Sequence, residues 1–178
     1  MVRVLVTAAS RHGSTAEIAT IIAGVLRDSD IVAEVLPPEA VASVLDYDAV
    51  ILGSAVYAGQ WLEPARAFVA RHADDLATRP VFLFSSGPLG DPPRSPVVPA
   101  DAIAVEMTTG AMDLQVFPGR LLVRHLSLPE RLVVARTHAP IGDFRPWDDI
   151  VDWTTEIARY LSEDSAAAGE ARRADGTG

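Results

Sequence analysis

The stretch VRVLVTAASRHGST, residues 2–15, contains the pattern that decides the fold. Its first part, residues 2–7, is short, β-branched and almost wholly apolar, which is typical of a strand buried on both faces. A small polar turn follows and ends at Gly13, where a helical pattern begins. The stretch therefore predicts a strand, a tight turn and a helix in immediate succession.

The predicted helix has apolar residues at positions i, i+3, i+4, i+7 and i+8, which lie on one face. Ser14 and Glu17 have the spacing of a capping box, so the helix is predicted to begin at Ser14 or Thr15. The apolar face is formed by Ile18, Ile21, Ile22, Val25 and Leu26.

Strand and helix patterns continue to alternate along the chain. Further strands are predicted at residues 31–36, 49–52, 80–84 and 113–117, and helices at 61–72, 100–107 and 146–161. Up to residue 85 no hairpin signal such as Asn-Gly separates them. Such a pattern is typical of parallel strands joined by right-handed helical crossovers. We therefore predict an α/β fold, an open parallel sheet with helices on both faces.

The composition limits the possible functions. The 178 residues suit one domain, which we assign to residues 1–162, and the small polar residues 163–178 are expected to form a disordered tail. Cysteine and lysine are absent, which excludes thiolate metal sites, Schiff-base chemistry and the lysine of nucleotide phosphate loops. The four scattered histidines leave little material for zinc, and we predict no metal site.

The net charge of −9 argues against a nucleic-acid partner. No targeting segment is visible at the N-terminus, and no apolar run is long enough to cross a membrane. We therefore expect a cytoplasmic protein.

Ligands of open parallel sheets bind beyond the carboxyl ends of the strands. The first loop at that edge, residues 8–15, has hydroxyl groups and Gly13 at the start of a helix. Unpaired amides and the helix dipole favour an anion there, such as a phosphomonoester. The other interpretation, an ordinary turn with a good helix cap, is equally consistent with the loop alone.

The second loop, residues 53–61, contains two aromatic residues beside glycines. Tyr57 suits stacking on a planar ligand, whereas Trp61 is favoured as a core residue of the following helix. The third loop, residues 85–90, offers backbone amides that could face the edge of a heterocycle, which is a weak signal by itself.

These three loops together resemble the flavodoxin family. The motifs are residues 9–15, the segment DYDAVILGSAVYAG at 46–59 and FSSGPLG at 84–90. With GDFRPWDDI at residues 142–150, they resemble in particular the branch of menaquinone-dependent protoporphyrinogen oxidases. The resemblance covers residues 2–161 and implies a five-stranded parallel sheet of order 2-1-3-4-5 that binds FMN at the strand ends.

The resemblance also implies which residues hold the cofactor. The phosphate would be held by Ser10, Arg11, His12, Gly13, Ser14 and Thr15. The flavin ring would lie between Ser54, Ala55, Val56, Tyr57, Ala58 and Gly59 on one side and Ser86, Gly87 and Pro88 on the other. The sequence departs from flavodoxins proper at Arg11 and His12, which bring one or two cationic side chains near the phosphate, and from the oxidase branch in the proline-rich residues 90–99.

The segment from Gly119 to Pro140 is basic in an acidic chain. Four arginines interleave with leucines and valines, and Glu130 is the single acid between Arg120 and His138. Such a segment can lie on an anionic membrane surface, here the inner face, or dock an acidic partner. The alternative, slightly favoured, is an insertion packed on the domain edge with solvated arginines.

Three functional hypotheses follow. In the first, the protein is an FMN-dependent oxidoreductase that takes electrons from a porphyrinogen-like substrate and passes them to a quinone, with no catalytic side chain required. In the second, it is a flavodoxin-type electron carrier without its own substrate. In the third, it is a relative that has lost FMN and binds or regulates, which the intact first loop disfavours.

Overall fold

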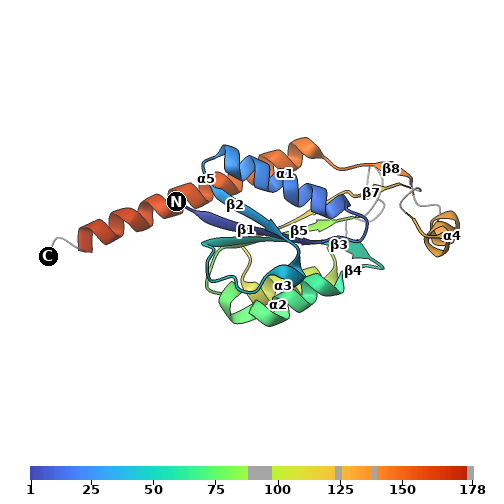
Figure 1. Ribbon diagram of the computed structural model, residues 1–178, viewed down its shortest axis with the longest axis horizontal. Coiled ribbons are helices and arrows are strands. Elements are labelled where there is room, and N and C mark those ends of the chain that lie inside the picture. Colours follow the sequence, from blue (N-terminus) through green and yellow to red (C-terminus); the bar gives the residue numbers. More distant parts are fainter. Residues whose placement is uncertain (88–97, 123–125, 138–139, 176–178) are drawn as a thin grey trace.

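The computed structural model describes residues 1–87, 98–122, 126–137 and 140–175; of residue 137 and residues 170–175 it describes the backbone alone. Figure 1 shows the arrangement of the helices and strands. In chain order the elements are β1 (Arg3–Ala9), α1 (Ser14–Asp28), β2 (Val32–Leu36), the 3-10 helix η1 (Pro38–Ala40), β3 (Ala49–Tyr57), β4 (Gln60–Trp61), α2 (Glu63–Leu76), β5 (Val81–Ser86), α3 (Ala100–Thr109), β6 (Asp113–Phe117), β7 (Arg120–Leu121), α4 (Leu128–Thr137), β8 (Gly142–Asp143) and α5 (Trp147–Asp175).

The central sheet confirms the predicted fold. Its parallel strands lie in the order β2-β1-β3-β5-β6. Numbered along the chain without the short β4, this is the order 2-1-3-4-5. The apolar strands β1, β3 and β5 lie inside the sheet, which agrees with their nearly continuous burial.

Helices cover both faces of the sheet, as Figure 1 shows. Helices α1 and α5 pack on one face around Ile22, Ile150 and Trp153. Helices α2 and α3 pack on the other face around Phe68, Leu83 and Val105. The two cores hold the sheet in place, and with it the ends of its strands.

Close packing at the centre of the sheet requires a glycine at position 53. Gly53 of β3 lies between Ala8 of β1 and Phe84 of β5. The buried ring of Phe84 covers Gly53 and contacts Phe117 and Trp153. A Cβ atom at position 53 would overlap this ring, so only glycine fits here.

Strand β3 runs beyond its predicted end at residue 52 and turns back into β4. Ala58 and Gly59 form the turn with φ angles of 50° and 76°. Two successive positive φ angles define the turn type that matches strand twist, but it ordinarily contains Asn-Gly or Asp-Gly. The hairpin was therefore not predicted, and Trp61 belongs to β4 rather than to helix α2.

Helix α1 begins at Ser14, as predicted, but without the predicted capping box. Gly13 is the residue before the helix, with a left-handed φ of 82°, and no side chain caps the helix. The Glu17 side chain instead pairs with two arginines from the C-terminal half of the chain.

Helix α5 does not end at residue 161, where the apolar repeat ends, but continues to Asp175. The composition predicted disorder for this segment, whereas its alanines and glutamates have high helix propensity. Beyond Leu161 the helix projects past the sheet in Figure 1, and the described side chains there are mostly exposed. None of the helices in the described ranges combines the length and apolarity needed to cross a membrane.

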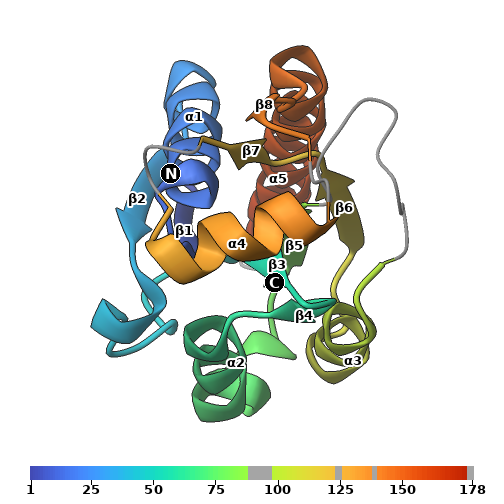
Figure 2. The same cartoon turned by 90° about the vertical axis from the view of Figure 1, so that its right-hand side faces the viewer.

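The basic segment after β6 folds back over the sheet. Strands β7 and β8 pair with each other, and α4 lies between them in the chain. Figure 2 shows α4 crossing the carboxyl ends of the central strands. The insertion therefore lies over the edge of the sheet at which ligands bind in such folds.

Candidate functional site

A pocket of about 290 Å³ lies at the carboxyl ends of the parallel strands, beneath α4. All three predicted loops contribute to its wall, so the structure brings together segments far apart in the sequence. The predicted residues that line it are Arg11, His12, Ser14, Thr15, Ala55, Val56, Tyr57, Ala58, Ser86 and Gly87.

The other predicted residues lie next to this wall. Ser54 is buried; its Oγ donates to Ala55 O at 2.9 Å and accepts from Leu62 N at 2.9 Å, so it joins β3 to the start of α2. Gly59 forms the hairpin turn, and Ser10 and Gly13 complete the loop before α1. Pro88, residues 90–97 and Arg124 lie outside the described residues.

We call residues 10–15 the cradle. Glu17 N makes the first helical hydrogen bond, to Gly13 O at 3.0 Å, so the earlier amides of α1 have no acceptor within the helix. The hydroxyls of Ser10 and Ser14 are inaccessible to solvent and have no hydrogen-bond partner among the described residues. Unpartnered donors at a helix N-terminus suit an anion with several oxygens, such as a phosphate.

The two aromatic residues of the second loop have different roles. Trp61 is 1% exposed, and its Nε1 donates to Ser85 Oγ at 2.8 Å, which confirms the core interpretation. Tyr57 is 38% exposed and lines the pocket. Its ring lies 6.3 Å from the His12 ring and 5.3 Å from the Arg11 guanidinium carbon, and burial raises the pKa of its hydroxyl. Stacking of Tyr57 on a ligand stays a prediction.

The side chains of Arg11 and His12 both contact helix α4 of the basic segment. Glu130 of α4 contacts His12 Nε2 at 3.0 Å and Arg11 Nε at 3.2 Å. Its other oxygen accepts from the amide and hydroxyl of Ser127 at 2.8 and 2.7 Å. These Ser127 hydrogen bonds, and then the one to His12, lower the pKa of Glu130 to about 2.

Ser127 and Glu130 thus have the spacing of a capping box at the start of α4, and Glu130 makes its half of that motif by accepting from the Ser127 amide. Sequence reasoning missed it, although the signal, Ser-Leu-Pro-Glu at residues 127–130, is present. We call residues 126–137 the cap, because α4 crosses the strand ends and its Val133 and Val134 line the pocket.

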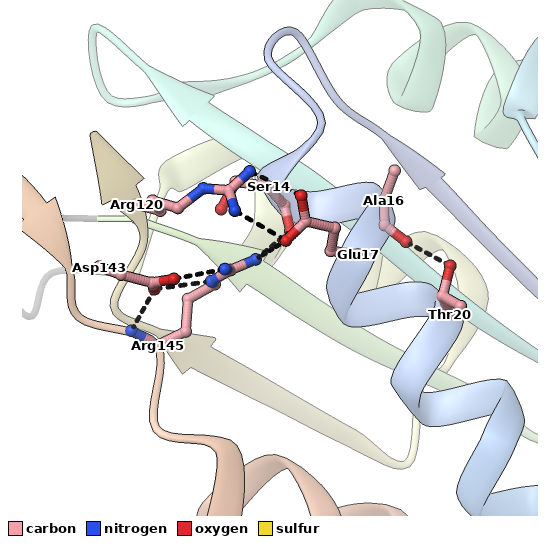
Figure 3. Close-up of polar contacts among 7 residues, drawn as sticks. All are labelled: Ser14, Ala16, Glu17, Thr20, Arg120, Asp143 and Arg145. Atoms are coloured by element: carbon pink, nitrogen blue, oxygen red, sulfur yellow. Dashed lines mark hydrogen bonds and ion pairs between the residues drawn. The ribbon is translucent and has the colours of Figure 1, made fainter. Parts of the chain in front are cut away.

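A second group of charges joins α1 to β7 and β8, as Figure 3 shows. Arg120 donates from Nη1 and Nη2 to both Glu17 oxygens at 2.8 and 2.6 Å. Arg145 donates from Nη1 to Glu17 at 2.8 Å and is also bound by Asp143. The hydrogen bonds from Arg145 and then from Arg120 lower the pKa of Glu17. The hydrogen bond from Arg145 likewise lowers the pKa of Asp143. No local spacing pattern signals this group, because Glu17 lies more than 100 residues before its two arginine partners.

The fold and the pocket define the class of protein, an α/β protein with a pocket at the carboxyl ends of its parallel strands. Comparison with known families agrees: the flavodoxin domain matches residues 5–142, and the chain belongs to this family. A search of curated protein sequences gives no significant match.

Solved structures share the fold at low sequence identity. A flavodoxin from the domain Archaea aligns with a TM-score of 0.60 and 14% identity over 90% of this chain and 99% of that chain. The Streptococcus pneumoniae TIGR4 flavodoxin aligns with a TM-score of 0.58 and 20% identity, over 91% of this chain and 99% of that chain. Rubredoxin oxygen:oxidoreductase from Desulfovibrio gigas aligns with a TM-score of 0.63 and 17% identity, over 92% of this chain but 37% of that chain.

Proposed function

We propose that this protein binds FMN in the pocket and carries electrons between redox partners. The observation that supports this most directly is the pair of buried, unpartnered hydroxyls of Ser10 and Ser14 beside the first amides of α1, which have no acceptor within the helix. A phosphomonoester would satisfy both sets of donors, which a structural turn leaves unpaired. The family to which the chain belongs supports the same cofactor.

In this proposal each part of the pocket has a separate task. The cradle binds the phosphate through amides and hydroxyls, and Tyr57 covers one side of the flavin ring. Val133 and Val134 of the cap exclude water from the pocket. FMN, when bound, supplies one- and two-electron redox chemistry, whereas the protein supplies binding, orientation and electrostatics.

The charge around the pocket favours a particular kind of partner. The chain as a whole is acidic, but the exposed surface of the cap contains Arg131 and Arg136. A partner that approaches the pocket meets these arginines first. We therefore propose an acidic docking surface on the redox partner, since opposite charges steer association and orient the complex.

A second candidate function is the oxidation of a porphyrinogen-like substrate with a quinone as acceptor. The observation that favours it is the apolar wall that Leu121, Val133 and Val134 add above the pocket. Such a wall suits a hydrophobic substrate or acceptor that has to reach a flavin. In this case we also propose that the cap contacts the inner face of a membrane, where quinones are dissolved.

One set of measurements tests the FMN site. The purified protein should show flavin absorption or bind added FMN, and it should bind riboflavin more weakly because riboflavin lacks the phosphate. Tyr57→Ala should weaken both ligands about three- to tenfold and reduce the quenching of flavin fluorescence. Absence of binding to both ligands would refute the proposal.

Turnover separates the two functions. A carrier should exchange electrons with protein partners and show no oxidation of protoporphyrinogen when menadione is the acceptor. Catalytic turnover in that assay by the FMN-loaded protein would instead establish the second candidate.

A further inference from the structure

Arg120 lies where a cation would be needed beside a bound phosphate. It begins β7 and lines the same pocket as Ser14 and Thr15, which begin α1. Its side chain is 13% exposed, so it lies in the wall of the pocket and not in bulk solvent. A guanidinium has five N–H donors in a planar fork that matches carboxylate and phosphate oxygens.

The position of Arg120 is fixed by neighbours that do not line the pocket. Both oxygens of Glu17 hold its guanidinium from one side, and Glu17 is itself fixed by Arg145. Arg145 is 3% exposed; it bonds Asp143 and Ser14 O and lies over the Trp147 ring at 4.3 Å. Figure 3 shows these side chains converging on the first turn of α1. Arg120 is therefore held in place before any ligand arrives, which lowers the entropy lost on binding.

Charge balance also points to Arg120. Arg11 and His12, the basic residues that the family resemblance placed near the phosphate, both contact Glu130 of the cap. Among the described residues Arg120 forms an ion pair with Glu17, which also pairs with Arg145, and Asp143 lies opposite Arg120 in the β7–β8 pairing and binds Arg145. A phosphate at the start of α1 carries more negative charge than a single helix terminus neutralises, because the helix dipole is equivalent to about half a charge.

We propose that Arg120 binds the phosphate of the cofactor, and that Glu17 and Arg145 position it for this contact. The inference rests on the proposed FMN site and assigns to it a residue from the insertion, which lies outside the three loops of the sheet. It predicts that Arg120 discriminates between phosphorylated and unphosphorylated flavin.

The experiment compares FMN and riboflavin binding to the wild type, Arg120→Gln, Arg120→Lys and the control Arg136→Gln. Arg136 is an exposed arginine of α4, so its substitution makes the same change in net charge away from the cradle. Affinities are measured by fluorescence titration at two salt concentrations, and thermal melting checks that each variant is folded.

We expect Arg120→Gln to weaken FMN binding about 10- to 100-fold and riboflavin binding less than about twofold. Arg120→Lys, which keeps the charge but loses the planar fork, should recover part of the loss. Added salt should weaken FMN binding to the wild type more than to Arg120→Gln, since one charge contact is missing in the variant.

Three results would overturn the inference. Unchanged FMN binding would show that Arg120 serves only the ion pair with Glu17. Equal loss for FMN and riboflavin would show that Arg120 shapes the pocket and does not contact the phosphate. A wild type that binds neither ligand would refute the FMN site itself and this inference with it, and so identifies failure of the proposed function.

Discussion

The cradle and the cap border the same pocket, but different forces hold them. The cradle follows β1, an inner strand of the sheet, and its shape depends on backbone bonds and on the packing of α1. The cap crosses the strand ends with Leu126 buried but its other two leucines exposed, and Glu130 joins it to the cradle through Arg11 and His12. Leu128 and Leu132 are 75% and 68% exposed.

This difference separates a part that positions a ligand from a part that can respond to one. A cradle built into the sheet keeps its geometry when a single side chain changes. A cap joined to the cradle by the two ion pairs of Glu130, both of them partly exposed, gains little stability from them, since surface pairs contribute about 0–1 kcal/mol. We therefore expect substitutions to affect global stability at the sheet, ligand binding at the cradle and local opening at the cap.

The largest effect should come from Gly53→Val, which breaks the sheet that supports the cradle. The added side chain would overlap the buried ring of Phe84, so we expect a loss of about 3 kcal/mol in the free energy of unfolding. Denaturant unfolding measures it. The control is Gly24→Ala in α1, where an added Cβ meets no neighbour and stability should rise by up to about 1 kcal/mol. Equal stability of both variants would contradict the packing of Phe84 on Gly53.

The next largest effect is expected for Ser14→Ala in the cradle, which should weaken FMN binding without lowering the stability of the free protein. Removing a buried hydroxyl without a partner should leave the free protein equally or slightly more stable. FMN affinity should fall about tenfold or more, because a hydrogen bond to a charged group contributes about 1.5–3 kcal/mol. Titration and melting of the same samples measure both. A parallel loss of stability and affinity would show that Ser14 has a structural role instead.

The sequence predicted the cradle far better than the cap. Strand β1, its turn and the start of α1 are encoded in one continuous stretch, so local patterns suffice. The predicted capping box of Ser14 and Glu17 fails because Arg120 and Arg145, distant in the chain, bind the Glu17 carboxylate. A pattern of neighbouring residues cannot show that arginines so distant in the chain bind the Glu17 carboxylate.

The same reasoning explains the other differences. The hairpin after β3 places Ala58 at a positive φ, where glycine or asparagine ordinarily signals a turn. The roles of Arg11 and His12 depend on Glu130, and thus on how a distant helix lies over the pocket. The site residues carried over from the family resemblance remain predictions, although most of them line one pocket.

Glu130→Gln should loosen the cap without affecting the sheet. The pKa of Glu130, about 2, lies below its ordinary value of 4.5, so the ionised carboxylate stabilises the cap above about pH 4.5. That contribution should disappear as the pH falls from 4.5 towards 2, and the variant should lack it at neutral pH. We expect amide exchange in α4 to become about two- to fivefold faster in the variant.

Hydrogen exchange followed by mass spectrometry measures this change, with β3 as the internal reference. The control is Glu163→Gln, which removes an exposed ion pair with Arg159 on α5 and should leave α4 unchanged. If α4 exchanges equally fast in the wild type and in Glu130→Gln, the cap is held by its apolar contacts and not by Glu130.

The last prediction concerns the outer surface of the cap, which we propose as the part that contacts an anionic membrane. Arg120 does not contribute to such contact, because its side chain is 13% exposed and lies in the pocket wall. Arg131 and Arg136 remain on the exposed helix beside Leu128 and Leu132. Each arginine near an anionic surface contributes about 1 kcal/mol, or about fivefold in binding. Arg131→Gln and Arg136→Gln should each weaken co-sedimentation with anionic vesicles by about that factor, and added salt should abolish the difference.

Arg159→Gln on α5 is the matched control. If the wild type does not bind anionic vesicles even at low salt, the arginines of the cap serve a protein partner, and any quinone acceptor has to reach the pocket from solution.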